Sequence, residues 1–424
     1  MKTGLVLLFA ALAASAAEPI AATPPMGWNS WDSYGTSVTE AEVKANADYM
    51  AAKLKSHGWQ YVVVDIQWSD ALAKPHGYRP NAELAMDEYG RLIPAANRFP
   101  SGFKALADYL HGKGLKFGIH IMRGIPRRAV AANLPVFGGK ARAADIADTK
   151  SICRWNGDMY GIDMSKPGAQ DYYDSILQLY ASWGVDYIKC DDIAIPFHGD
   201  EIAALHKAIG KTGSAIVLSL SPGPADLAKA DFYAANANLW RISGDFWDLW
   251  RDLRKSFDLL EKWSPFVKPG GWPDADMLPL GRIGIRAERG DDRPTRFTRD
   301  EQRTLITLWS IARSPLMFGG DLPSLDAFTE SLLTNDEVLA ANQKGAGARK
   351  LSQDGDAIIW TAQVEGAEGA AGKKYLAVFN IGEQAREIAI PASGPLRDVW
   401  EKKDVGALQS VKLPPHASAM YRVK

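Results

Sequence analysis

The chain has 424 residues, of which 46% are hydrophobic and 23% are charged, an ordinary composition for a globular protein. Its 49 basic and 50 acidic side chains leave a net charge of −1, which gives no indication of binding to nucleic acid or to an anionic membrane surface. The length suffices for one large α/β domain and one small domain.

The N-terminus has the three parts of a secretory signal. Lys2 supplies a positive charge, residues 5–12 an apolar run, and residues 14–16 an A-S-A cleavage site. We therefore expect residues 1–16 to be a signal peptide that is removed, and the mature protein to be periplasmic or extracellular. We expect no membrane association after cleavage, because no later stretch is apolar enough to span a bilayer.

Strand and helix signals alternate about eight times between residues 20 and 345. Apolar β-rich runs predict strands at 26–31, 61–64, 116–120, 183–192, 215–220, 238–242 and 315–318, and residues 269–277 are rich in turns. Helical spacing predicts helices at 40–56, 102–113, 169–183, 198–212, 246–263 and 299–312, whereas 123–167 is long and irregular. This alternation predicts a (β/α)₈ TIM barrel over residues 20–345.

The C-terminal part of the chain follows another pattern. Short strands are predicted at 357–363, 374–380, 385–390, 396–401 and 418–423, with turn residues and no helix between them. Residues 350–424 are therefore expected to form a small antiparallel β-sandwich.

The run WGVDYIKCDD at 183–192 is the strongest chemical signal in the chain. It is a buried strand that ends in Lys189, Cys190, Asp191 and Asp192, and active-site residues of barrel enzymes lie at such strand ends. Lys189 favours the ionised form of Asp191, which suits a nucleophile. By itself, the run is equally compatible with a solvated cluster of charges at the surface.

Carboxylates occur at four predicted strand ends or turns, at residue 65, at 191–192, at 245 and at 274–276. Such a set is compatible with a metal site, but only His120 offers an imidazole at a strand end, and no paired histidine motif occurs. We therefore expect no metal or other cofactor and favour a glycosidase with two carboxylates. In that interpretation Asp245 is the proton donor, because Phe246 and Trp247 would desolvate it; Arg241 is assumed to contact the substrate.

Six blocks carry a resemblance to a known family. In order, they are TPPMGWNSWDSYG, YVVVDIQW, GLKFGIHI, WGVDYIKCDD, WRISGDFWD and PGGWPDADML. From about residue 23 to the C-terminus the chain resembles glycoside hydrolase family 27, the α-galactosidases and α-N-acetylgalactosaminidases. The resemblance implies a retaining glycosidase that uses no metal and acts on an oligosaccharide or glycan.

The resemblance also implies residue roles. Asp191 matches the family nucleophile and Asp245 the acid/base. The residues matched to sugar binding, together with strand-end positions expected to contact the sugar, are Trp31, Asp65, His120, Lys189, Ser221, Arg241, Asp276 and Met277.

Three departures concern the sugar rather than the chemistry. Ile66 replaces the second of two aspartates, so one acceptor for the axial 4-hydroxyl is lost, His120 replaces a frequent tyrosine, and Ser221 stands where galactosidases often have glutamate. The leading expectation is a secreted α-galactosidase. The alternatives are a β-L-arabinopyranosidase, an α-N-acetylgalactosaminidase or an isomaltose-releasing enzyme of the same family, a carbohydrate-binding barrel without catalysis, and a metal-dependent hydrolase. The sequence leaves open the oligomeric state and whether Cys153 and Cys190 form a disulfide.

Overall fold

The computed structural model describes residues 19–79, 81–364, 374–392 and 394–424. The expected signal peptide, residues 1–16, lies outside the described residues. Within them, none of the helices has the length and apolar character that a membrane span requires.

An eight-stranded parallel barrel forms the centre of the molecule, as predicted. Its strands are β1 (Met26–Asn29), β2 (Tyr61–Val64), β3 (Lys116–Met122), β7 (Tyr187–Asp191), β8 (Val217–Leu220), β9 (Leu239–Arg241), β10 (Trp272–Asp274) and β13 (Leu316–Phe318). They are hydrogen-bonded in the order β10-β9-β8-β7-β3-β2-β1-β13. The sheet closes where Leu278, just after β10, forms a parallel bridge with Phe318. The strands are almost entirely buried, which explains their continuous apolar runs.

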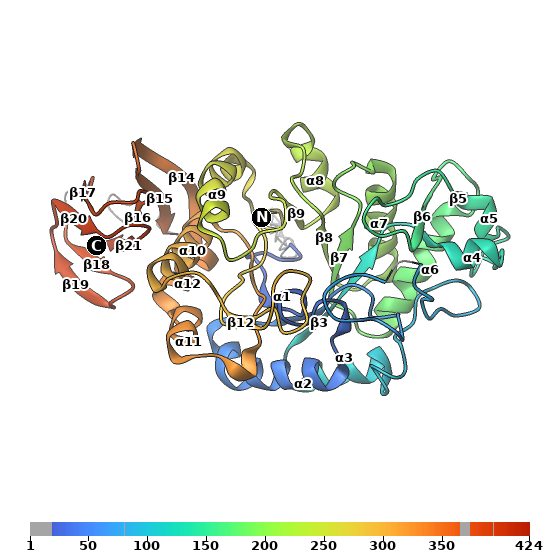
Figure 1. The fold of residues 1–424 in the computed structure, drawn as a ribbon. Coiled ribbons are helices and arrows are strands. Elements are labelled where there is room, and N and C mark those ends of the chain that lie inside the picture. The colour runs from blue at the N-terminus through green and yellow to red at the C-terminus, as the bar shows by residue number, and fades with distance from the viewer. Residues whose placement is uncertain (1–18, 80, 365–373, 393) are drawn as a thin grey trace, which may run out of the picture.

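Helices connect the strands and surround the barrel (Figure 1). They are α2 (Glu40–Tyr49), α3 (Gly102–Gly112), α6 (Ala169–Ser182), α7 (Gly199–Thr212), α8 (Ala230–Asn236), α9 (Trp250–Trp263) and α10 (Arg299–Ala312). Thr39 and Thr298 begin α2 and α10 with capping boxes, in which each threonine and a glutamate three residues later satisfy free backbone N–H groups. The helix α8, which has only two turns, was not predicted from the sequence.

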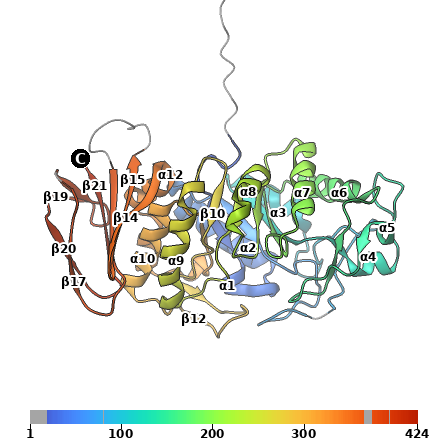
Figure 2. The same cartoon turned by 90° about the horizontal axis from the view of Figure 1, so that it is seen from above.

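The long segment after β3 is partly ordered into a small lobe. It contains β4 (Ile125–Pro126), α4 (Arg127–Ala131), α5 (Ala143–Ile146), β5 (Ala147–Asp148) and β6 (Met159–Ile162). The strand β6 pairs antiparallel with both β4 and β5. Seen from two directions, this lobe lies at the end of the molecule opposite the C-terminal strands (Figures 1 and 2).

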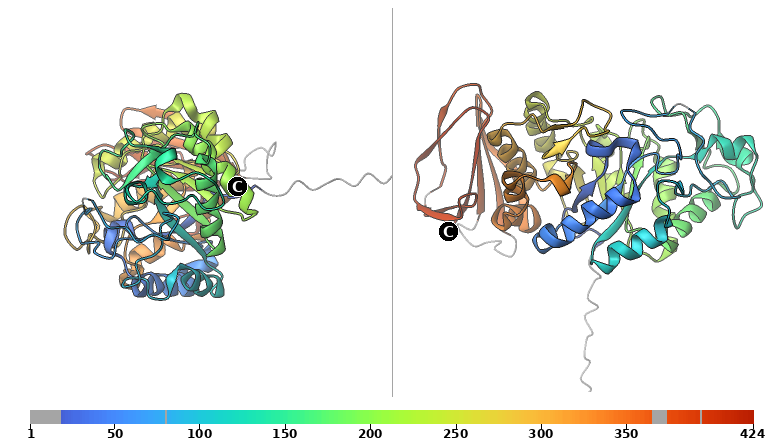
Figure 3. Two further views of the ribbon diagram at one scale, coloured as in Figure 1. Left: turned by 90° about the vertical axis from the view of Figure 1, so that its right-hand side faces the viewer. Right: turned by 60° about the horizontal axis from the view of Figure 1, so that its bottom comes forward.

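The C-terminal strands form the predicted antiparallel sandwich. One sheet has the order β14-β15-β16-β21-β18-β19 and the other pairs β17 with β20. Their bounds are β14 (Gly345–Asp354), β15 (Ala357–Val364), β16 (Lys374–Asn380), β17 (Arg386–Ala389), β18 (Leu396–Asp398), β19 (Lys403–Gly406), β20 (Ser410–Leu413) and β21 (Ser418–Val423). The first sheet packs against α10 (Figure 3), where Trp400 Nε1 donates to Thr307 Oγ1 at 2.9 Å. The sandwich has a small apolar core of its own.

The remaining elements are short. They are α1 (Trp31–Tyr34), β11 (Arg282–Ile283), β12 (Arg293–Pro294), α11 (Ala327–Leu333) and α12 (Asp336–Lys344), together with 3-10 turns and a π-helical turn at Met50–Leu54 that continues α2. That π turn lies within the longer helix that the spacing predicts at 40–56.

Candidate active site

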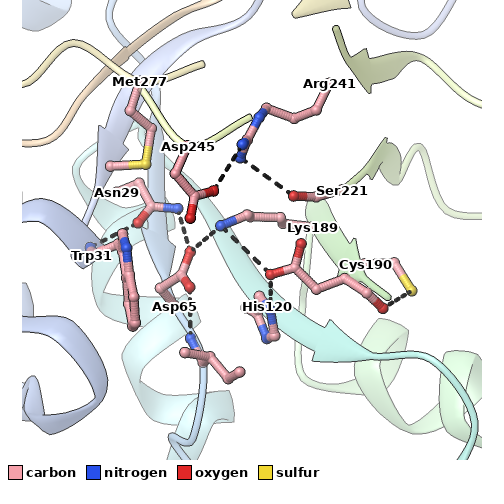
Figure 4. Close-up of polar contacts among 12 residues, drawn as sticks. Asn29, Trp31, Asp65, His120, Lys189, Cys190, Ser221, Arg241, Asp245 and Met277 are labelled. Carbon is pink, nitrogen blue, oxygen red and sulfur yellow. Dashed lines mark hydrogen bonds and ion pairs between the residues drawn. The ribbon is translucent and has the colours of Figure 1, made fainter. Parts of the chain in front are cut away.

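A cavity of about 340 Å³ lies at the C-terminal ends of the barrel strands. Its volume is at the lower end of the range for small-molecule sites. Nine of the ten predicted site residues line it: Trp31, Asp65, Lys189, Asp191, Ser221, Arg241, Asp245, Asp276 and Met277. They come from different strand ends and converge on one space (Figure 4), as the barrel topology requires.

Asp65 is the centre of a hydrogen-bond network at the end of β2. Its Oδ2 accepts from Asn29 Nδ2 at 2.7 Å and from Lys189 Nζ at 2.9 Å, and its Oδ1 accepts from the backbone N–H of Ile66 at 2.9 Å (Figure 4). Burial opposes ionisation of Asp65, but the Lys189 ammonium lowers its pKa below the usual value. The network holds this carboxylate ionised and fixed at the cavity wall.

Asp191, at the end of β7, is held as an anion. Its Oδ2 lies 2.7 Å from His120 Nε2 and 3.9 Å from Lys189 Nζ. Burial raises the pKa of this carboxyl, but the Lys189 and His120 side chains hold the pKa well below its usual range. Its Oδ1 is buried and has no hydrogen-bond partner among the described residues. An ionised carboxylate with one unpartnered oxygen has the properties of a nucleophile.

The His120 side chain does not lie at the cavity surface, where it was expected. It is 2% exposed and does not line the cavity, so it contacts Asp191 rather than the space that a sugar would fill. Its backbone carbonyl accepts from Trp68 Nε1 at 2.6 Å, which fixes the strand end behind the cavity. His120 thus lies against Asp191, and its contact with a sugar stays a prediction.

The surroundings of Asp245 also differ from the prediction. The Asp245 side chain is 45% exposed, and Arg241 Nη2 donates to its Oδ1 at 2.9 Å (Figure 4). The prediction that Phe246 and Trp247 desolvate Asp245 is wrong. Both aromatic side chains are buried, but the Asp245 carboxylate remains open to solvent. Arg241 lines the cavity, as expected for a residue that contacts the substrate, but the expectation that it does not contact Asp245 is wrong. Arg289, on the loop at 284–292, lies 3.6 Å from Asp245 Oδ2.

Asp276 and its neighbours form the wall between β10 and β13. Asp276 has a backbone φ of +89°, and its Oδ2 accepts from the backbone N–H of Phe246 at 2.8 Å and lies 3.2 Å from Arg241 Nη2. Burial raises the pKa of Asp276 despite the Arg241 contact, and burial together with Asp276 raises the pKa of Asp274 to about 6. Arg241 thus bridges two carboxylates, one buried and one exposed.

Five further residues line the cavity that the sequence patterns did not indicate: Asp32, Tyr78, Trp155, Glu288 and Arg289. Four of them lie in loops whose course depends on tertiary packing, and Asp32 lies on the short helix α1. Its position directly after Trp31, in the GWNSWD block, was the available signal. Asp32 is 2% exposed, and its side chain makes no hydrogen bond within the described part of the chain.

Both cysteines are free and buried, which resolves the question of a disulfide. Burial raises the pKa of the Cys153 thiol to about 12, so neither its position nor its acidity suits a nucleophile. Among the described residues, no three histidine, cysteine, aspartate or glutamate side chains are grouped so that they would hold a metal ion.

Comparison with known proteins gives two family matches. The family model described as alpha galactosidase A matches residues 23–165 and 162–344, and that of the alpha galactosidase C-terminal β-sandwich domain matches residues 354–423. Among curated proteins, the α-galactosidase of Coffea arabica is 30% identical over 96% of this chain and 94% of its own length. Alpha-galactosidase 2 of Arabidopsis thaliana is 29% identical over 95% and 89% of the two chains.

A solved structure is more similar. The GH27 β-L-arabinopyranosidase of Geobacillus stearothermophilus is 54% identical, covers 95% of this chain and 96% of its own, and superposes with a TM-score of 0.92. A variant of that enzyme was solved in complex with arabinose. These matches agree with the carboxylates at the strand ends and with the C-terminal sandwich. The chain therefore belongs to glycoside hydrolase family 27, the α-galactosidase family.

Proposed function

We propose that the protein is a retaining β-L-arabinopyranosidase. The observation that carries the proposal is its 54% identity to the Geobacillus stearothermophilus β-L-arabinopyranosidase over nearly the whole of both chains. The identity to the curated α-galactosidases is about half as high. This proposal changes the leading expectation from sequence, α-galactosidase, in favour of one of its alternatives.

The chemistry of the two sugars supports this choice. A β-L-arabinopyranoside has the ring configuration of an α-D-galactoside and lacks only the hydroxymethyl group on C5. An ionised carboxylate offers about four acceptor positions. In Asp65 three of these are taken by Asn29, Lys189 and the Ile66 backbone, which leaves one for a sugar hydroxyl. Ile66 does not line the cavity and adds no acceptor, so the hydroxymethyl hydroxyl, which only the galactoside carries, finds no second carboxylate beside Asp65.

The two catalytic carboxylates have the roles of a double displacement. Asp191 attacks the anomeric carbon while the Asp245 carboxyl protonates the departing oxygen, which breaks the glycosidic bond and forms a glycosyl–Asp191 ester. Asp245, now a carboxylate, takes a proton from water as that water attacks the anomeric carbon and releases Asp191. Its 45% exposed side chain is open to the incoming water, and Arg241 fixes its orientation.

A hydrolysis panel tests the proposal. Purified protein is assayed on nitrophenyl β-L-arabinopyranoside, α-D-galactoside, α-N-acetylgalactosaminide and α-glucoside, each with and without a chelator. We expect the highest kcat/KM on the arabinopyranoside, unchanged by chelator. A higher value on the α-galactoside would make the protein an α-galactosidase, and loss of activity with chelator would favour a metal-dependent hydrolase.

The stereochemistry is tested separately. In an NMR time course of the arabinopyranoside, a retaining enzyme releases β-L-arabinopyranose first, before mutarotation. Initial release of the α anomer would refute the double displacement.

A further inference from the structure

A second cavity, here called the side groove, opens beside the active-site cavity. It has a volume of about 620 Å³, and its walls include Lys150, Ile152, Arg154, Trp155, Ile195 and Pro222. Trp155 and Pro222 also line the active-site cavity, so the two spaces share a wall. Through this shared wall, a glycoside whose reacting sugar occupies the active-site cavity can extend its leaving-group part into the side groove.

The side groove has an apolar floor that the fold leaves open to solvent. Ile152, Trp155 and Ile195 are 41%, 39% and 42% exposed, and such clusters of exposed apolar side chains mark binding surfaces. The Trp155 ring lies 5.3 Å from that of Tyr78, which stacks on Trp31 at 5.5 Å and 22°. A row of aromatic rings therefore runs from the predicted sugar-binding Trp31 to the side groove. The apolar face of a second sugar ring packs well on such a row.

The side groove also has two positively charged side chains at its surface. Lys150 and Arg154 are exposed, and neither forms an ion pair within the described ranges. The carboxylate of Asp192, which lines the same groove, is 6% exposed and paired with Arg123 at 2.7 Å. Asp148 accepts from the backbone N–H of Lys150, not from its ammonium group. Two cations thus remain available beside an aromatic platform.

We propose that the side groove binds the leaving-group part of a glycan substrate, and that this part is an acidic sugar such as a uronic acid. The ring packs on Trp155, and its carboxylate pairs with Arg154 and Lys150, since arginine can bind a carboxylate through two parallel hydrogen bonds. The inference rests on the proposed function, because the side groove can bind a leaving group only if the protein cleaves a glycosidic bond.

The test compares two substrates that differ in one charge. One is a disaccharide in which a β-L-arabinopyranosyl unit is linked to glucuronate, and the other is its methyl ester. For the unaltered protein we expect kcat/KM on the acid to exceed that on the ester on the order of tenfold, as two exposed ion pairs would give. The ratio should fall toward one at high ionic strength, where exposed charges are screened.

Variants locate the effect. In the double variant Lys150→Gln/Arg154→Gln the acid-to-ester ratio should fall to about one. The matched control is Lys207→Gln, which removes an exposed lysine of α7 that lines neither cavity and forms no ion pair with any residue the structure describes; in this variant the ratio should stay unchanged. Trp155→Ala should raise KM for both disaccharides and leave their ratio intact.

The outcomes separate this inference from the proposed function. If nitrophenyl β-L-arabinopyranoside is not cleaved, the proposed function fails. If it is cleaved but the acid is no better than its ester, or neither disaccharide is cleaved, the side groove does not bind an acidic sugar. A ratio that survives in the double variant, or a Trp155→Ala variant with unaltered KM, likewise overturns the inference.

Discussion

Replacement of Ile66 by aspartate should shift the specificity of the enzyme toward galactosides. Asp65 retains one acceptor position after its bonds to Asn29, Lys189 and the Ile66 backbone. The hydroxymethyl hydroxyl, which only a galactoside carries, then has no acceptor from residues 65 and 66, and a buried unpaired hydroxyl costs about 1–3 kcal/mol. That corresponds to a factor of roughly 5 to 150 in kcat/KM. In the Ile66→Asp variant we expect the α-galactoside-to-arabinopyranoside ratio of kcat/KM to rise by a factor in this range.

The assay measures both nitrophenyl substrates on the same preparation. The ratio of the two kcat/KM values does not depend on the fraction of active protein. This matters because Ile66 is only 3% exposed, and a second carboxylate buried beside Asp65 will lower the melting temperature of the variant. Ile66→Val is the control, since it keeps the site apolar, and its ratio should match that of the unaltered protein. An unchanged ratio in a folded Ile66→Asp variant would refute the acceptor-count argument.

Three further changes test the assigned roles. Asp191→Asn should lower kcat on nitrophenyl arabinopyranoside to background, while calorimetry still detects arabinose binding; appreciable residual turnover would remove its assignment as nucleophile. Asp245→Asn should slow alkyl arabinopyranosides far more than nitrophenyl ones, since a good leaving group needs little protonation, and equal damage to both would remove its assignment as the acid. Burial, followed by the Asp276 carboxylate, raises the pKa of Asp32 well above its usual value, so the native protein loses stability as pH rises above the pKa of the unfolded chain. Asp32→Asn should therefore raise the free energy of unfolding at pH 7 by roughly 1–3 kcal/mol and leave it unchanged below about pH 4. Denaturant titrations at both pH values measure this difference. A stability gain of the same size at both pH values would contradict the prediction.

Much of the fold was predictable because a barrel strand carries its signal locally. A run such as YVVVD at 61–65 is apolar throughout and then ends in a carboxylate, and the topology alone brings such ends together. Strand β10 has only three residues, one of them a proline, and it lies in the turn-rich segment 269–277, which hid it. Strand β14 was missed because most of its residues are exposed and two register shifts interrupt its pairing.

The surroundings of the site residues were less predictable than the residues themselves. Whether Arg241 contacts Asp245, and whether His120 faces the cavity or Asp191, depends on side-chain directions that spacing does not determine. Tyr78 and Trp155 come from loops far apart in the sequence, and the fold places their rings in a tilted contact at the cavity. Local sequence patterns contain no information on such a contact.

Closure of the barrel has a consequence for the synthesis of the chain. Strand β1 pairs with β13, and Trp28 Nε1 donates to the carbonyl of Gly320, which is 292 residues later. At typical rates of translation, about 5–20 residues per second, β1 waits on the order of 15–60 s for its second neighbour. During that time its outer edge has unpaired backbone groups, which favour pairing with other chains. The nascent protein is therefore most prone to aggregation in the interval before residue 318 is available, and the folded protein, with no open edge in its barrel, is protected.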